Sequence, residues 1–490
     1  MDIENITLCP ERTIYKKFIN EPKNQEDDNF FKKKKALEEQ YKLAFHNYVA
    51  EVYPYLKYEK TNDKVYWNYD EKEGVYKELS FAEVRSFVIK LLIDEGLLRV
   101  ATESEAKSVL NKLRASFPEW AVTQDDFVTT GSWLHVNNGW LNLDTLELFP
   151  HTHEKLSLYK MSVDYNPEAV CPLYDKFLDE DLQMKKDAVR VIDQFSGYML
   201  TDSIEEQVML VFEGRPGCGK STIPRIWLKM LGKKGTTASL TSLGQGEARF
   251  MGDVFAHRNF CFFDEANPKT QNINEYFMNM VDKDDIKIER KGIQGHSDVR
   301  NTLKMVLALN EMPDHQPEGF GRRYRHLLFT RSFTDEGVAD RGFQQKIVDN
   351  ELSGVLNRML KALIDYKKMG GLTSIEGELE RKRNHTLAAD DISAFVEEHF
   401  MPVNDGVVRY NYQQMRSAFV NEFPKSYNKQ LSVQSFNKKL MSVRLPEFKH
   451  ITTGRNYNGR GYVGLKLKKG HSFGEMYEQI RIENEVVDWW

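Results

Sequence analysis

The chain has 490 residues, of which 41% are hydrophobic and 29% charged, a composition typical of globular proteins rather than of disordered or membrane-embedded ones. At this length we expect about three domains. No run of about 18 apolar residues predicts a membrane span. The acidic start and four cysteines without a CxxC pair argue against a secretory signal, a disulfide framework and a structural zinc site. We therefore expect a protein of the reducing cytosol.

Charge is distributed unevenly along the chain. The net charge is −5, yet residues 391–470 contain 13 Lys and Arg against 6 Asp and Glu, so this segment carries +7 and the remainder −12. A compact basic segment in an acidic protein is typical of a module that contacts a polyanion such as nucleic acid. Ordinary variation of surface charge is the alternative.

The N-terminal part is predicted to mix helices and strands. Strand pairs are expected at 65–76 and at 134–143, and the second pair turns on Asn137-Asn138-Gly139. Helical patterns flank these strands, at 36–55, 81–95 and 103–116. Together they predict an α+β accessory domain over residues 1–168, with a boundary near Ala169.

The pattern changes from Val208 onward to short, continuous apolar runs, at 208–212, 261–263 and 305–309. Such runs between helical segments are typical of a parallel sheet that is covered on both faces. The sequence therefore predicts an α/β domain. It comprises a helical lead-in at 169–207, with helix expected from Leu173 to Leu200, and the sheet-containing part at 208–375, with helix expected from Phe343 to Lys368.

The strongest motif is Gly-Arg-Pro-Gly-Cys-Gly-Lys-Ser at 214–221, which fits the pattern GxxxxGKS/T and lies between an apolar strand and a helix predicted at 222–231. In such a loop, backbone N–H groups bind phosphate, the lysine contacts the β- and γ-phosphates and the hydroxyl is a ligand of Mg²⁺. We therefore predict ATP and Mg²⁺ as ligands. The predicted ATP-binding residues are Gly214, Arg215, Pro216, Gly217, Cys218, Gly219, Lys220, Ser221 and Thr222.

Further polar residues follow the later strands. Asp264 is expected to hold Mg²⁺ together with Ser221, and Glu265 to polarise the attacking water. Asn310 follows the next apolar run, where an amide can orient water. Arg322 and Arg323 follow a glycine turn. An arginine supplied by a neighbouring subunit raises the rate about 10³–10⁵-fold in known cases, and a structural ion-pair cluster is the alternative.

The order of these motifs resembles that of superfamily 3 helicases, the hexameric AAA+ motors of small viruses, phages and plasmids. Other sequence segments are similar to those of the phage/plasmid and poxvirus-type primase–helicase family. They are Val136-Asn137-Asn138-Gly139 with Leu141 and Asp144, the segment from Tyr165 to Pro172 with Phe177-Leu178, Gly197-Tyr198 with Leu200, Leu309-Asn310-Glu311-Met312-Pro313 and Arg322-Arg323. The resemblance covers about 120–470 and is most specific over 135–330. It implies an AAA+ P-loop core, a homo-oligomeric ring (a hexamer), ATP bound between subunits and 3′→5′ movement on DNA.

The resemblance also implies two DNA-contacting elements. One is a hairpin that projects into the ring channel, here at 286–296, with Lys291 as the first candidate and Lys287, Arg290 and His296 beside it. The other is a winged-helix-like domain over 391–470, preceded by a linker at 376–390 and followed by an acidic tail at 471–490. Its predicted DNA-binding residues are Lys438, Lys439, Arg455 and Arg460.

These features predict an ATP hydrolase that is a replicative DNA helicase of a phage, plasmid or mobile element. It would act on single-stranded and forked DNA in the cytoplasm of a bacterium or virus-infected cell, without a membrane partner. Two main alternatives stay open: an ATP-regulated factor that binds or loads at an origin, and a motor subunit that depends on a separate primase or loader. A third, weaker alternative is a motor that acts on RNA. Residues 1–130 contain no recognisable primase motif, so primer synthesis is not expected.

Overall fold

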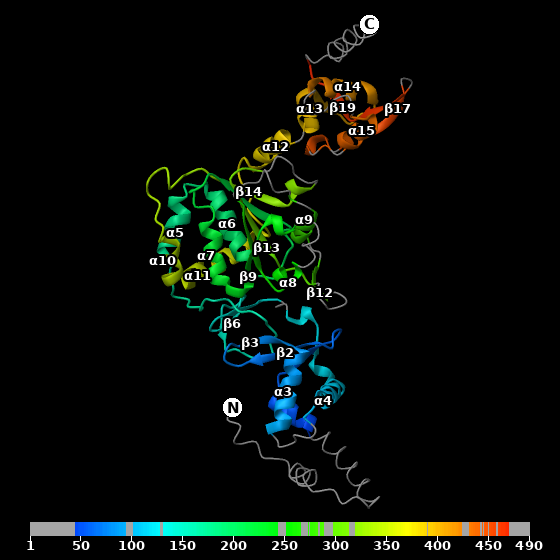
Figure 1. Cartoon of the computed structure of the whole chain (residues 1–490). Coiled ribbons are helices and arrows are strands. Elements are labelled where there is room, and N and C mark those ends of the chain that lie inside the picture. The colour runs from blue at the N-terminus through cyan, green and yellow to red at the C-terminus, as the bar shows by residue number, and fades with distance from the viewer. Residues whose placement is uncertain are drawn as a thin grey trace, which may run out of the picture.

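The computed structural model describes residues 45–94, 101–127, 131–243, 251–265, 273, 275–282, 285–288, 297–312, 319–389, 391–423, 431–441, 443, 445–448, 450–456 and 459–469. Along the chain these residues form an N-terminal mixed region, a central sheet covered by helices and a smaller C-terminal unit (Figure 1). Within these ranges, none of the helices combines the length and hydrophobicity that a membrane span requires.

The two strand pairs that the sequence predicted in the N-terminal region are present, as the antiparallel pairs β2–β3 and β5–β6. Its larger sheet has the order β3-β2-β1-β4, and its smaller sheet the order β5-β6-β7. Helices α3 (Phe81–Asp94) and α4 (Glu103–Ser116) pack against the larger sheet. The strands are β1 (Lys57–Glu59), β2 (Val65–Asp70), β3 (Val75–Ser80), β4 (Ala121–Val122), β5 (Trp133–Val136), β6 (Gly139–Asn142) and β7 (Leu148–Phe149).

The central sheet has five parallel strands in the order β14-β8-β13-β10-β9, which confirms the predicted α/β class. The three predicted apolar runs form three of its strands. The strands are β8 (Met209–Gly214), β9 (Gly235–Ala238), β10 (Phe260–Glu265), β13 (Lys304–Leu309) and β14 (Tyr324–Phe329). Because β13 lies between β8 and β10 and all three strands are parallel, their C-terminal ends lie side by side. We call this row of strand ends the sheet edge.

Alternate side chains of each strand enter two different cores, since a strand presents successive residues to opposite faces. Leu210 and Phe212 of β8 belong to the core beneath α6 (Lys186–Tyr198), α7 (Thr222–Leu231) and α11 (Leu352–Met369). Met209 and Val211 belong to the core beneath α8 (Gly252–Phe255) and α9 (Glu275–Val281). Figure 1 shows the two sets of helices on opposite faces of the sheet. Burial on both faces explains the continuous apolar runs of β8, β10 and β13.

Two helices that the sequence predicted as continuous are interrupted. The segment expected to be helical from Leu173 to Leu200 divides into α5 (Pro172–Lys176), a π-helical turn (Phe177–Asp181) and α6. The segment expected from Phe343 to Lys368 divides into α10 (Phe343–Asn350) and α11. Glu351, at this second break, accepts hydrogen bonds from the backbone N–H groups of Leu173 and Tyr174 at 3.1 Å. The break therefore provides the cap for α5.

The charged segment at 376–390, expected to be a linker, contains a helix, α12 (Glu378–Ala389). Beyond it lies the C-terminal unit, whose three helices pack around one apolar core with short strands and a hairpin of β17 and β18. Ser432 caps α15 as its position predicted, because its hydroxyl accepts from the Ser435 N–H at 3.1 Å. The elements are α13 (Asp391–His399), β15 (Phe400–Pro402), β16 (Tyr410–Asn411), α14 (Tyr412–Glu422), α15 (Val433–Met441), β17 (Thr452–Asn456), β18 (Gly459–Val463) and β19 (Leu465–Leu467).

Candidate functional site

The loop between β8 and α7 takes its shape from glycines. Gly217 and Gly219 have φ angles of 77° and 83°, which residues with a side chain rarely adopt. A Cβ on Gly217 would also lie 2.2 Å from Thr334 Oγ1. Within the described part of the chain, no acceptor is recorded for the backbone N–H groups from Gly217 to Ser221. Five consecutive donors at the start of a helix are suited to an anion such as phosphate.

The remaining loop residues support this shape. Arg215 and Pro216 are exposed, whereas Cys218 is buried and fills the space beneath the loop. A Cβ on Gly214 would lie 2.9 Å from Cys218 Sγ, so the close approach requires glycine. The N–H of Thr222 donates to the Gly219 carbonyl at 3.0 Å and so begins α7.

Lys220 is directed along the edge of the sheet. Its side chain is only 8% exposed, and Nζ donates to Asn310 Oδ1 at 2.9 Å and to the Arg215 carbonyl at 3.2 Å. Asn310 directly follows β13, the neighbour of β8, so the strand order explains the contact. The structure thus brings together two predicted residues that lie 90 positions apart.

Ser221 meets the end of β10. Its hydroxyl donates to Asp264 Oδ1 at 3.0 Å, and Arg225 donates to Asp264 Oδ2 at 2.6 Å. A hydroxyl beside a carboxylate is a pair of hard oxygen ligands of the kind that Mg²⁺ prefers, so these residues fit that ion. Glu265 is the last residue of β10 and pairs with Leu309 in the ladder. The Glu265 side chain lies outside the described residues, so its role stays a prediction.

Sequence analysis missed Arg225. It lies on α7, four positions after Ser221, and residues at this spacing share one face of a helix. This spacing could have indicated that a cation lies beside the predicted Asp264–Ser221 pair.

Arg322 and Arg323 lie at the other end of the strands, where the parallel strands begin. They directly precede β14, whose first residue, Tyr324, pairs with Met209 at the start of β8. The loop follows the far end of β8, about 20 Å away at the usual rise of a six-residue strand. An arginine side chain cannot cover this distance, so neither residue reaches the Lys220 of its own chain.

The two arginines differ in their contacts. Arg323 is held by Asp282, which accepts from Nε at 2.9 Å and from Nη2 at 2.6 Å, and its Nη1 donates to the Gly319 carbonyl. The ion pair raises the pKa of the Arg323 guanidinium. Arg322 is exposed, and among the described residues no ion pair of its side chain is recorded. Nothing in the sequence around Asp282 indicated this pairing.

The predicted DNA-binding residues divide between two places. Lys287 is exposed on β11 (Ile286–Ile288), which pairs antiparallel with β12 (Ser297–Val299). This pair forms the base of the predicted hairpin, whereas Arg290, Lys291 and His296 lie outside the described residues. Four predicted residues are exposed on the C-terminal unit, namely Lys438, Lys439, Arg455 and Arg460.

Arg455 and Arg460 lie directly opposite each other on β17 and β18. Like charges in this position repel each other, and a bound anion relieves the repulsion. Both arginines belong to the same packed unit as α15, because Tyr462 of β18 donates to Asn437 of that helix.

Comparisons with known proteins match two parts of the chain. Residues 34–183 match a family described as D5 N terminal like, and residues 212–323 match a family of unknown function, DUF5906. The first match fits the resemblance to the primase–helicase family. The second extends from β8 to Arg323 and so contains every predicted catalytic residue. A search of curated proteins finds no match.

Among solved structures, an A-form apo structure of the NrS-1 C-terminal region aligns at 10% identity. The alignment covers 84% of this chain and 96% of that chain, with a TM-score of 0.47. Another apo structure of the same region aligns at 11% identity and a TM-score of 0.42, over 87% and 99% of the two chains.

Proposed function

We propose that this chain is the ATP-hydrolysing motor of a DNA helicase, in a replication protein of the primase–helicase type from a phage, plasmid or mobile element. The observation that carries this proposal is the arrangement of side chains at the C-terminal ends of the central strands. There the Lys220–Asn310 and Ser221–Asp264 contacts join a loop of available N–H donors to the ends of two neighbouring strands. Phosphate, an attacking water and a divalent ion are bound by donors and oxygens of these kinds.

In the proposed reaction, the loop N–H groups and Lys220 bind the β- and γ-phosphates of ATP. A water attacks the γ-phosphorus, the bond to the bridging oxygen of ADP breaks, and Glu265 accepts the proton of the water. Asn310 holds Lys220 by its amide oxygen, and its amide would also orient the attacking water. Ser221 and Asp264 would hold Mg²⁺, which neutralises charge on the phosphate oxygens when it is bound.

The arginines support a site shared between subunits. Arg322 is exposed at the end of the strands opposite its own loop, so it can serve only the site of another chain. We infer that Arg322 contacts the γ-phosphate bound by a neighbouring subunit, and that Arg323 stays with Asp282 as a structural residue. A homo-oligomeric ring, for which we propose a hexamer, satisfies this requirement at every interface.

Two DNA-binding surfaces complete the proposal. The hairpin that begins at β11 would contact one strand in the channel, and the C-terminal unit, which we propose is winged-helix-like, would contact DNA phosphates through Lys438, Lys439, Arg455 and Arg460. Cycles of hydrolysis would move the hairpins and draw the strand through the ring.

The test is strand displacement on forked DNA that carries only a 3′ or only a 5′ tail, with wild-type protein and Lys220→Ala. We expect ATP-dependent displacement from one tail polarity, lost in the variant. Specific duplex binding that survives Lys220→Ala, without displacement, would favour an origin-binding or loading factor. ATP hydrolysis without displacement would favour a motor subunit that needs a separate primase or loader.

A further inference from the structure

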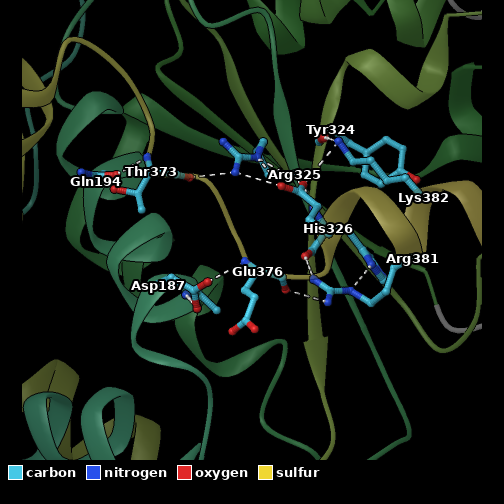
Figure 2. Close-up of polar contacts among 11 residues, drawn as sticks. Asp187, Gln194, Tyr324, Arg325, His326, Thr373, Glu376, Arg381 and Lys382 are labelled. Carbon is cyan, nitrogen blue, oxygen red and sulfur yellow. Dashed lines mark hydrogen bonds and ion pairs between the residues drawn. The ribbon is translucent and has the colours of Figure 1, made fainter. Parts of the chain in front are cut away.

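Helix α12 is bonded to the edge strand β14 at three consecutive residues. Arg381 donates to the His326 carbonyl from Nη2 at 3.3 Å and to His326 Nδ1 from Nε at 3.2 Å. Lys382 donates to the Tyr324 carbonyl and lies 4.6 Å from the centre of the Tyr324 ring. Figure 2 shows both side chains directed at the strand. The outermost strand of the sheet, β14, is therefore covered by the helix that leads to the C-terminal unit.

A buried carboxylate strengthens this junction. Glu378, at the start of α12, accepts from Arg325 Nε at 3.0 Å and from the His326 N–H at 2.8 Å, and is only 5% exposed. Burial alone would raise the pKa of the Glu378 carboxyl, but the bonds from Arg325 and the charge of Lys382 hold the pKa below its ordinary value. Arg325 also donates to the Thr373 carbonyl at 2.7 Å, which ties the preceding loop to the same strand (Figure 2).

His326 continues the connection into the sheet. Since Arg381 donates to Nδ1, Nε2 of the neutral ring carries the proton, and it donates to Glu213 Oε2 at 2.7 Å. Glu213 directly precedes Gly214, where the phosphate-binding loop begins. A continuous set of hydrogen bonds therefore runs from α12 through β14 to the strand that carries the loop.

The middle of α12 is also fixed to the C-terminal unit. Arg383 forms ion pairs with Glu397 of α13 at 2.5 Å and with Glu447 at 2.7 Å. Arg381 and Arg383 are two residues apart, about 3 Å along the helix axis. Side chains of one helical turn thus contact the central sheet and the C-terminal unit, so a displacement of either unit acts on the other.

We propose that α12 is a coupling helix that transmits DNA binding at the C-terminal unit to ATP turnover at the phosphate-binding loop, through Arg381, His326 and Glu213. The inference rests on the proposed function and assigns to the segment at 376–390 a role beyond connection. It differs from a passive linker in one measurable respect: cutting the bonds to His326 separates the two activities without removing either.

The decisive variant is Arg381→Ala, because it removes both side-chain bonds to His326 and leaves the buried Glu378 pair intact. Glu376→Ala is the matched control, since the Glu376 side chain is exposed and pairs only with exposed Lys185 among the described residues. ATP hydrolysis is measured with and without DNA, alongside the DNA affinity and the melting temperature of each protein. We expect Arg381→Ala to lose about fivefold or more of the stimulation by DNA, with basal hydrolysis and DNA affinity changed less than about twofold.

Full stimulation by DNA in Arg381→Ala would overturn the inference while leaving the proposed function intact. Absence of hydrolysis in the wild type would instead contradict the proposed function. Hydrogen exchange supplies a readout that does not need hydrolysis. DNA is expected to change exchange of the β8 and β14 amides in the wild type and in Glu376→Ala, but not in Arg381→Ala. Unchanged exchange in the wild type would also overturn the inference.

Discussion

The edge of the central sheet and the basic surface of the C-terminal unit both gather polar side chains, yet they are built in opposite ways. At the sheet edge, parallel strands bring residues to fixed positions, and Lys220 is buried and hydrogen-bonded to Asn310. On the C-terminal unit, Lys438 and Arg455 are exposed side chains on a helix and a hairpin.

This difference sets what each region can do. Fixed donors in a site of low water content are suited to chemistry on one small group, because they need no rearrangement during the reaction. Exposed cations are suited to a long polyanion, whose phosphates they contact in many registers. Removing one residue should therefore have a large effect at the sheet edge and a small, additive effect on the C-terminal unit.

The largest effect is expected for Lys220→Ala. Loss of the ammonium beside the γ-phosphate should lower ATP hydrolysis on the order of 1000-fold, measured by release of phosphate. Lys229→Ala is the matched control, since Lys229 is exposed near the end of α7, the helix that follows the loop. Hydrolysis in Lys220→Ala within about tenfold of wild type would contradict the proposed role of the loop.

The second prediction separates the two arginines. Arg322→Ala should lower hydrolysis by about 100-fold or more without a loss of stability, since the side chain is exposed. Arg323→Ala should lower the free energy of unfolding by about 1–2 kcal/mol, because Asp282 loses its partner. Hydrolysis assays and thermal denaturation measure the two effects.

Mixed assemblies sharpen this prediction. Subunits with Arg322→Ala retain a complete loop, and subunits with Lys220→Ala retain Arg322. Mixing the two should therefore restore hydrolysis at some interfaces. No restoration at any ratio, in assemblies shown to be mixed, would exclude a site shared between subunits.

The third prediction concerns the C-terminal unit. Removing the charges of Lys438, Lys439, Arg455 and Arg460 together should weaken DNA binding roughly tenfold at moderate salt. On single-stranded DNA it should also reduce the magnitude of the slope of log affinity against log salt by up to about 3, because four phosphate contacts are lost. Nucleotide affinity should not change. An unchanged slope would show that DNA binds elsewhere.

The smallest effect is expected for Arg225→Ala. Arg225 occupies one oxygen of Asp264 and so competes with a divalent ion for that carboxylate. The pair is exposed, so its loss should lower the Mg²⁺ concentration needed for half-maximal nucleotide binding by at most about fivefold. Titration of Mg²⁺ against a fluorescent nucleotide measures this, and a higher requirement in the variant would contradict the competition.

Much of the sheet edge could be predicted from the sequence because its signals are local. The apolar strands, the glycines of the loop and the helix at 222–231 each depend on neighbouring residues, and parallel strands then bring Asn310 and Asp264 to the loop. The exposed cations of the C-terminal unit were named by residue type and by the family resemblance, and only the structure places Arg455 opposite Arg460.

Other features could not be predicted because they depend on distant partners. The Arg323–Asp282 pair joins residues 41 positions apart with no shared pattern, so the sequence left both arginines as candidates. The charged segment at 376–390 has few apolar positions, which favoured a linker. Its helix is stabilised by Glu378 and Arg381, whose partners lie more than 50 positions earlier in β14.

Calorimetric titration with a non-hydrolysable ATP analogue and Mg²⁺ tests the central claim most directly, because it measures the sheet edge without DNA, assembly or turnover. We expect one nucleotide per chain in the wild type and in Lys229→Ala, with affinity at least about tenfold weaker in Lys220→Ala and clearly weaker in Asn310→Ala. Equal affinity in the wild type and Lys220→Ala would place the nucleotide elsewhere and contradict the account.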